Sequence, residues 1–338
     1  MPILSVRNVH KRFADLHAVA GVSFEVQPGE IFGFLGPNGA GKTTTLRMLM
    51  GITRPDQGEV AFEGRPELDR ARIGYLPEER GLYEDASALE TLVYLAALRR
   101  VPAARAREDG ARWLARLDLA DRARSKVGTL SKGNQQKVQF AGSILHRPSL
   151  AVLDEPFGGL DPLNQELFLE LIRELRDQGT TVLLSAHQLD LVERLCDRFL
   201  LIAKGRGILS GTLDAIRRAA AGGAGEVLSL DVRTSGTLAD GRRALEELAR
   251  RVANGASTQV EPTPEGALRV EASLPDGTDL GPILAQFAAH ARIERVQMRP
   301  LRLHEIYVRA VRGDDGGDGD AAAAAAAAGT SPGEVSGG

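Results

Sequence analysis

The chain has 338 residues, with 42 Lys and Arg against 45 Asp and Glu, a net charge of −3 and 43% hydrophobic residues. This length suits about two domains, and the near-neutral balance excludes a strongly basic nucleic-acid-binding protein, so no nucleic-acid partner is expected. The single cysteine, Cys196, excludes a disulfide framework and a multi-cysteine metal site. No apolar run approaches the roughly 18 residues of a membrane span, and the first residues do not form a secretory signal. We therefore expect a cytoplasmic protein.

Apolar runs that alternate with helical patterns predict an α/β domain over residues 1–220. Each run is almost continuously apolar, as strands buried on both faces are, which predicts a mainly parallel sheet with helices on both faces. Between about residues 84 and 147, Ala, Leu and Arg recur at helical spacing without a strand-like run, so a helical insertion is expected there. The predicted strands cover residues 31–35, 149–154, 180–186 and 198–203.

A glycine-rich loop follows the first of these strands. The segment GPNGAGKTT matches the pattern G-x-x-x-x-G-K-[ST] of a P-loop, and the apolar helix pattern LRMLM comes just after it. Backbone N–H groups of such a loop surround phosphate oxygens, and the helix N-terminus adds its partial positive charge. Lys42 is expected to reach the β- and γ-phosphates, and Thr43 is expected to ligate Mg²⁺. The predicted nucleotide-binding residues are Gly36, Pro37, Asn38, Gly39, Ala40, Gly41, Lys42, Thr43 and Thr44.

Two carboxylates stand where the predicted strand over residues 149–154 ends. Asp154 closes an apolar run, so it is expected at the edge of a buried strand, beside the P-loop, where it would hold the Mg²⁺ shell. Glu155 follows directly. Because the chain turns at a strand end, the Glu155 carboxylate can face the γ-phosphate and act as the general base that orients water. The pair therefore predicts nucleotide hydrolysis.

Further motifs, in chain order, make residues 3–220 resemble the nucleotide-binding subunits of ABC transporters. The segment LSKGNQQ is similar to the signature motif of that family, and FGGLDP with Asp161 is similar to its D-loop. His187 stands where the family has a switch histidine that contacts the γ-phosphate, and Phe13 where it has an aromatic ring that stacks on adenine. Each of these residues, considered alone, could also have a structural role. Ser131 of LSKGNQQ, for example, could be a helix N-cap.

The resemblance implies a mechanism that needs two chains. Two ATPase subunits pair head to tail, and each ATP, with Mg²⁺, lies between the P-loop of one subunit and the signature segment of the other. This chain carries one copy of each motif, so a homodimer is the simplest arrangement. A separate transmembrane permease would hold the dimer on the inner face of the cell membrane. The implied catalytic residues are Lys42, Glu155 and His187, and the signature residues acting in trans are Ser131, Lys132, Gly133 and Asn134.

The sequence departs from the commonest family pattern at three positions. Lys132 and Asn134 replace Gly and Gln of the signature LSGGQ, and an added cation near phosphate is chemically tolerable. Glu78, in IGYLPEERGLY, stands where a glutamine is expected. Its carboxylate can approach Mg²⁺ or its water shell but cannot donate a hydrogen bond as an amide does. The same string, with a small C-terminal domain, resembles exporter-type ATPases that include sodium-efflux and drug-efflux systems. An exporter is therefore expected, without a defined substrate.

The composition changes twice after the nucleotide-binding region. AAAGGAGE at residues 219–226 predicts a linker. Strand and helix patterns then restart over residues 226–312 in the order β-α-β-β-α-β, which predicts a small α+β accessory domain of ferredoxin-like type with a closing helix. We expect this domain to regulate or dimerise the protein. Residues 313–338, rich in Gly, Asp and Ala, predict a disordered tail.

Two other functional classes are alternatives to an exporter subunit. A soluble ABC-type ATPase with a regulatory or non-transport role typically carries two fused nucleotide domains or a long coiled coil, and neither is visible. A P-loop GTPase or small-molecule kinase is disfavoured because the chain has no N-K-x-D guanine motif and because the signature segment has no place in either. ATP hydrolysis coupled to transport is therefore the main hypothesis.

Overall fold

A computed structural model describes most of the chain. The linker predicted for residues 219–226 lies largely outside the described residues, and the tail predicted for residues 313–338 lies almost entirely outside them. The described residues are 1–220, 226–234, 238–253, 258–275 and 277–314.

The chain divides into two compact units, one comprising residues 1–211 and the other beginning at Thr212. Helix α7 (Leu213–Ala220), which the sequence pattern grouped with the first domain, belongs to the second unit. It packs there against α10 (Leu303–Asp314), and the Arg217 guanidinium donates a hydrogen bond of 2.9 Å to the carbonyl of Leu301.

A six-stranded sheet ordered β5-β6-β7-β3-β8-β9 forms the centre of the first unit. Neighbouring strands are parallel except β8 and β9, and every residue of β3, β6 and β7 is buried. The predicted α/β fold with a mainly parallel sheet is thus confirmed. The strands are β3 (Ile31–Leu35), β5 (Ile73–Leu76), β6 (Leu150–Asp154), β7 (Thr181–Ala186), β8 (Arg198–Ala203) and β9 (Arg206–Gly211).

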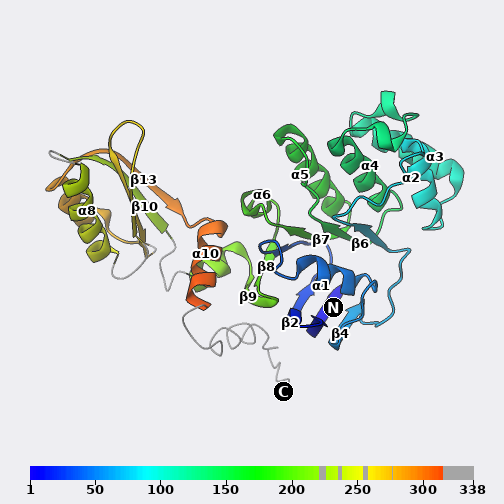
Figure 1. Ribbon diagram of the computed structural model, residues 1–338, viewed down its shortest axis with the longest axis horizontal. Helices are drawn as coiled ribbons and strands as arrows, with labels where there is room; N and C mark the ends of the chain where they lie inside the picture. The colour runs from blue at the N-terminus through cyan, green and yellow to red at the C-terminus, as the bar shows by residue number, and fades with distance from the viewer. Residues whose placement is uncertain (221–225, 235–237, 254–257, 276, 315–338) are drawn as a thin grey trace, which may run out of the picture. The chain divides into compact units, whose positions relative to one another are not determined.

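Helices cover both faces of this sheet, as buried parallel strands require. Figure 1 shows α1 (Lys42–Leu49) on one side and α5 (Pro162–Asp177) with the short α6 (Leu189–Glu193) on the other. Helix α5 begins at an N-cap, because the Asp161 side chain accepts a hydrogen bond from the backbone N–H of Asn164, and proline follows at the first helical position.

The sequence patterns did not predict a second, antiparallel sheet in the first unit. It is ordered β2-β1-β4, with strands Leu16–Val26, Leu4–Phe13 and Gln57–Phe62. Phe24 of β2 stacks at 5.4 Å between centroids on both Phe32 and Phe34 of β3, so the two sheets share one core. The pattern of β1 is irregular because its pairing with β2 shifts register at several points, which hides the alternation expected of a half-buried strand.

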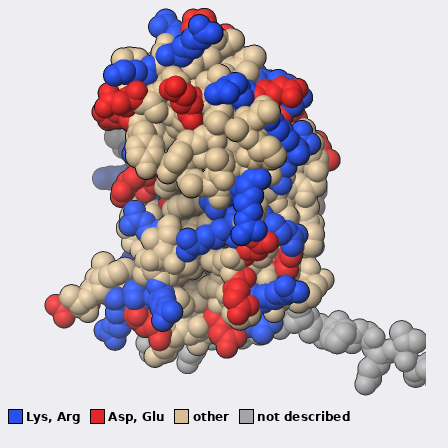
Figure 2. Space-filling view, turned by 90° about the vertical axis from the view of Figure 1, so that its right-hand side faces the viewer, with Lys and Arg blue, Asp and Glu red and all other residues tan. Residues whose placement is uncertain are grey.

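Residues 84–147 hold helices and no strand, and they gather at one end of the first unit (Figure 1). Helix α2 opens with a capping box between Ser87 and Glu90. Charged side chains of both signs interleave on this side of the unit (Figure 2), and Arg116 pairs there with Glu174 of α5. The helices are α2 (Ala88–Ala97), α3 (Ala103–Arg116) and α4 (Lys132–Ile144), with 3₁₀ turns at Ala120–Arg122 and Val127–Thr129.

His146, just after α4, is expected to make the first unit less stable at acidic pH. Burial lowers the pKa of His146 to about 4, and the nearby Arg99 adds to the effect. The unfolded chain takes up a proton near pH 6.5, whereas the folded chain resists it, so the contribution to stability is complete above pH 6.5 and is lost as the pH falls towards 4. After allowance for the partial exposure of His146, we expect the free energy of unfolding to fall by on the order of 2 kcal/mol over this pH range.

Urea unfolding at pH 7.5 and pH 4.5 measures this effect. His146→Gln should unfold with a smaller difference in free energy between the two pH values than the unchanged chain, because glutamine does not titrate. Equal pH dependence in the two proteins would contradict the assignment to His146.

The second unit is a four-stranded antiparallel sheet ordered β11-β12-β10-β13. Its elements follow the predicted order β-α-β-β-α-β, and α8 and α9 pack apolar side chains on one face of the sheet. Among the described residues of the whole chain, none of the helices combines the length and hydrophobicity that crossing a bilayer demands. The elements are β10 (Glu226–Arg233), α8 (Leu238–Val252), β11 (Thr258–Pro262), β12 (Leu268–Leu274), α9 (Leu280–Ala288) and β13 (Arg292–Pro300).

Candidate functional site

The glycine-rich loop joins β3 to α1 and can be built only with glycine at two of its positions. A side-chain carbon at Gly36 would lie 2.4 Å from the carbonyl oxygen of Ile202, and one at Gly41 would lie 2.4 Å from that of Ala18. Gly41 also has a φ of 101°, which L side chains rarely adopt. The loop can therefore turn its backbone N–H groups inward just before helix α1 begins at Lys42.

Lys42 is buried, and its ammonium is directed back into the loop. It donates hydrogen bonds of 2.8 Å to the carbonyl of Gly36 and 3.2 Å to that of Pro37. The same nitrogen lies 3.2 Å from Oε1 of Glu155, within ion-pair distance but outside hydrogen-bond alignment. The P-loop and the residue that follows β6 thus both contact the Lys42 ammonium.

Asp154 is fully buried at the end of β6, and it lies beside Thr43. Its Oδ1 accepts a hydrogen bond of 2.5 Å from Ser185 on the neighbouring strand β7, and Thr43 Oγ1 lies 3.5 Å away. Burial raises the pKa of Asp154, although the hydroxyls of Ser185 and Thr43 oppose that shift. Its second oxygen, Oδ2, is buried and has no hydrogen-bond partner among the residues that the structure describes. This oxygen is therefore available to coordinate a cation.

Glu155 turns towards the same place because its backbone leaves the strand conformation. Its φ of 51° lies in the left-handed region, at a cost of about 1 kcal/mol for a residue other than glycine. The Ser185 hydroxyl and the carbonyl of Ser185 both accept from the Glu155 N–H, at 3.0 and 3.2 Å, and hold this turn. Glu155 Oε2 lies 2.8 Å from Nδ1 of the half-exposed His187. Consecutive carboxylates, which would face opposite ways along a strand, thus both face the P-loop.

Glu78 reaches the site from the loop after β5. The Thr43 hydroxyl donates a hydrogen bond of 3.1 Å to its Oε2. Gln139 of α4 holds this loop, because its side-chain amide donates 3.1 Å hydrogen bonds to the carbonyls of Pro77 and Glu79, on either side of Glu78. Motif reasoning missed Gln139 and Ser185, since neither belongs to a recognisable pattern and each acts through a contact distant in sequence.

The P-loop, with Lys42 and Thr43, lines a cavity of about 230 Å³, whereas the fully buried Asp154 is not among its lining residues. Besides the P-loop it is lined by Glu78, Glu155, Ala18 and Leu16, the last of which is 65% exposed. Phe13 is not among the lining residues. It lies opposite Leu16 across the β1–β2 hairpin, is 49% exposed, and has the ammonium of Lys11 5.5 Å from its ring centroid. Sequence reasoning missed Leu16, whose only signal is a large apolar side chain at a strand start.

Comparison with known proteins identifies the family of the chain. A family model described as ABC transporter matches residues 19–158. The chain is 43% identical over 218 residues to an ABC transporter ATP-binding protein of Bacillus subtilis, a match that covers 64% of this chain and 73% of that protein. The chain belongs to the ABC transporter family. It is an ATP-binding ATPase subunit of that family.

Other relatives of this ABC subunit carry related descriptions. It is 40% identical over 223 residues to the Nod factor export ATP-binding protein I of Burkholderia lata, covering 64% of this chain and 73% of that protein. A solved ATP-binding subunit of an ABC transporter aligns with a TM-score of 0.60 at 34% identity, covering 64% of this chain and 92% of that one. The likeness therefore lies in about two thirds of the chain.

The signature segment of the ABC subunit begins helix α4 and does not line the cavity. Ser131 is its N-cap, and its hydroxyl accepts a hydrogen bond of 3.3 Å from the N–H of Asn134. Gly133 lies against the loop that precedes Asp161, since a side-chain carbon there would be 3.4 Å from the carbonyl of Gly159. Gln136 of α4 donates 3.1 Å to the carbonyl of Pro156, which follows Glu155. Within one chain, α4 thus contacts the segment that follows Glu155, while residues 130–136 do not line the P-loop cavity.

Proposed function

We propose that the ABC subunit hydrolyses ATP with Glu155 as the general base, and that it powers export through a separate permease. The observation that carries this proposal is the position of Glu155, whose two oxygens lie 3.2 Å from the Lys42 ammonium and 2.8 Å from His187. A carboxylate so placed beside a P-loop can orient water towards a γ-phosphate and accept its proton.

The residues around Thr43 fit Mg²⁺. Asp154 has a buried oxygen that no described residue bonds, and the Thr43 hydroxyl and the Glu78 carboxylate meet beside it. These are hard oxygen donors, and Mg²⁺ is commonly held by one or two carboxylates together with substrate phosphates. Thr43, Asp154 and Glu78 would hold the ion, which neutralises charge on the β- and γ-phosphates when bound.

The remaining residues then have separate tasks. The backbone N–H groups of the P-loop and the ammonium of Lys42 bind the phosphates. Glu155 accepts a proton from the attacking water as oxygen bonds to the γ-phosphorus and the bond to ADP breaks, which yields ADP and phosphate. His187 keeps the Glu155 carboxylate in place through their 2.8 Å contact and, as in the family, would touch the γ-phosphate. Phe13, with Leu16, would contact the adenine.

We infer that the complete site needs a second subunit, most simply a second copy of this chain. Ser131 and Lys132 of the signature segment are exposed at the N-terminus of α4, and helix N-termini attract phosphate charge. In a head-to-tail dimer this segment would close the partner's cavity, with Asp161 at the dimer contact. The signature residues in that role are Ser131, Lys132, Gly133 and Asn134.

Export is the direction that the relatives favour. The Burkholderia relative is described as an export protein, and the sequence around Glu78 with a small C-terminal unit resembles efflux ATPases. A permease that binds this subunit would hold it at the inner face of the membrane. Co-purification with a membrane-spanning partner, followed by ATP-dependent transport in vesicles, tests this part of the proposal.

Ser131→Arg tests the dimer directly. The bulky cation should leave ATP binding to the P-loop intact and lower hydrolysis at least about 100-fold, because the composite site cannot close. ATP binding and phosphate release are measured in parallel on the same preparation. Normal hydrolysis by this variant would contradict a role for the signature in trans.

A mixing experiment provides the control. Ser131→Arg and Lys42→Ala are each expected to be inactive, yet a mixed dimer regains one intact site, formed by the P-loop of the first chain and the signature of the second. Activity that appears only on mixing supports the arrangement, whereas no recovery despite proven mixed dimers would overturn it.

A further inference from the structure

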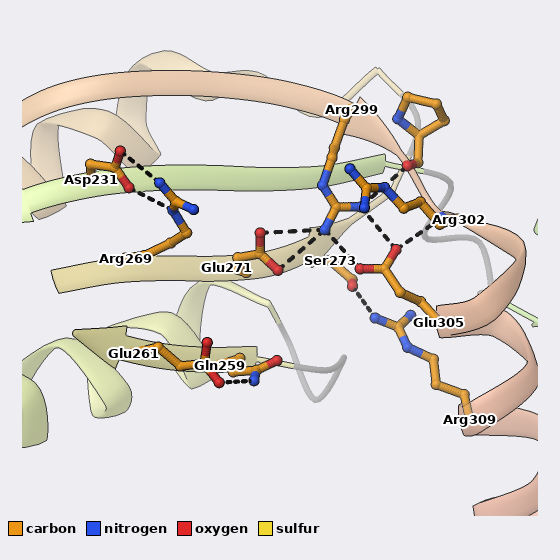
Figure 3. A network of polar contacts seen from close by, with 11 residues as sticks. Asp231, Gln259, Glu261, Arg269, Glu271, Ser273, Arg299, Arg302, Glu305 and Arg309 are labelled. Carbon is orange, nitrogen blue, oxygen red and sulfur yellow. Dashed lines mark hydrogen bonds and ion pairs between the residues drawn. The ribbon is translucent and has the colours of Figure 1, made fainter. Parts of the chain in front are cut away.

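The second unit contains a polar cavity of about 370 Å³, which shares no lining residue with the P-loop cavity. It lies between α10 and the face of the sheet opposite α8 and α9 (Figure 3). Its volume is at the small end of the range for ligand sites in proteins. The polar residues that line it include Gln259, Glu271, Ser273, Glu305 and Arg309.

Alternation along the strands makes this face polar. Leu228 and Leu230 of β10 belong to the core under α8 and α9, so the residues between them and their cross-strand partners point the other way. Glu271 lies opposite both Ser229 and Gln259 in the sheet register, and Ser273 lies two residues further along β12. The strand side of the cavity is thus lined by polar side chains of β11 and β12, with the apolar Val227 of β10 beside them.

Arg299 of β13 neutralises the acidic wall of the cavity only in part. Its guanidinium makes two hydrogen bonds of 2.7 and 2.8 Å to Glu305. The same guanidinium makes weaker contacts of 3.2 and 3.3 Å to Glu271. Two carboxylates therefore share one cation, and Glu271 keeps the capacity to accept another donor.

Arg309 supplies the opposite charge at the other side of the cavity. Its side chain is half-buried, and it donates a hydrogen bond of 2.5 Å to the hydroxyl of Ser273, which is 1% exposed. Among the described residues no carboxylate lies within ion-pair distance of this guanidinium, although it has five donors in a fork that matches a carboxylate. Burial lowers the pKa of Arg309, but an arginine stays charged.

We propose that this cavity binds a small molecule with one carboxylate and, beside it, an amino or hydroxyl group. The carboxylate would pair with Arg309 and accept from the Ser273 hydroxyl. The donor group would face Glu271, the less satisfied of the two acids, with Gln259 next to it. A dianion is disfavoured because the two glutamates repel a second negative charge. The site would let such a metabolite act on the second unit of the ABC subunit.

Calorimetric titration of the full chain with five probes tests the proposal. L-Serine and lactate carry the required pair of groups, butyrate lacks the donor, and succinate and phosphate carry excess negative charge. We expect saturable binding of L-serine or lactate, one molecule per chain, with Kd on the order of 1 mM or tighter. Butyrate, succinate and phosphate should bind at least about 10-fold more weakly, the effect of one lost charge-assisted contact.

Variants distinguish this cavity from other sites. Arg309→Gln should weaken binding of the probe at least about 10-fold, whereas Arg302→Gln, which changes an exposed arginine just before the same helix, should not. Glu271→Gln provides a readout that a purely structural role would not move, because it should weaken L-serine more than lactate. Circular dichroism checks that each variant is folded.

The proposal fails if neither L-serine nor lactate binds at about 10 mM, if butyrate binds as tightly, if phosphate binds as tightly while ADP occupies the P-loop, or if Arg309→Gln binds normally. Because the readout is binding and not hydrolysis, these outcomes are independent of the assignments at the ATP site.

Discussion

Glu155→Gln is expected to lower the rate of ATP hydrolysis about 10³-fold while ATP binding is retained. Glutamine keeps the shape of the side chain and its place beside Lys42 and His187, but it cannot accept the proton of the attacking water. Loss of the negative charge also removes repulsion between this residue and the γ-phosphate. The variant should therefore accumulate as an ATP-bound dimer, because closure no longer leads to hydrolysis.

Phosphate release and size-exclusion chromatography with light scattering, both with ATP and Mg²⁺, measure the two effects. Glu166→Gln is the matched control, since that exposed glutamate pairs with Arg194 on the surface of α5 and α6 and lies outside the cavity. Near-normal turnover of Glu155→Gln would exclude Glu155 as the base. A slow variant that stays monomeric with ATP would separate the chemical role from the proposed dimer.

Lys42→Ala is expected to weaken ATP binding about 100-fold, near 3 kcal/mol. The substitution removes the ammonium that the P-loop carbonyls hold, and with it a charge-assisted hydrogen-bond donor to the phosphates. In addition, Glu155 would lose the cation 3.2 Å from its Oε1, so its negative charge would oppose the incoming nucleotide. Both effects act in the same direction.

Equilibrium titration with a fluorescent ATP analogue measures this loss. Lys126→Ala is the control, because Lys126 is exposed and pairs with Asp85 away from the cavity. Lys42→Met, which fills the buried space of the aliphatic stem, distinguishes lost charge from lost packing. Thermal unfolding of each variant reports its stability. Unchanged affinity in a folded Lys42→Met protein would rule out the P-loop assignment.

The central strands and most helices could be predicted because their signals are local. The apolar runs that became β3, β6, β7 and β8 are buried on both faces, so their sequence has to be continuously hydrophobic. The antiparallel sheet of β1, β2 and β4 could not be found in this way. Its strands are partly exposed and shift register, so their alternation is broken. The sheet also packs on the central sheet through contacts distant in sequence, such as those of Phe24 with Phe32 and Phe34.

By itself, the sequence determined the chemistry of this ABC subunit. The P-loop, Asp154 and Glu155 each lie within one short segment, where the required glycines, the lysine and the carboxylates are dictated by local backbone geometry and by phosphate charge. Only the tertiary structure decided how these segments meet. Ser185 ties Asp154 and Glu155 to the next strand, Gln139 holds the loop of Glu78, and Arg309 faces Glu271 across a cavity. Such contacts join residues far apart in the chain, and the packing of whole elements, not the neighbours in sequence, brings them within hydrogen-bond distance.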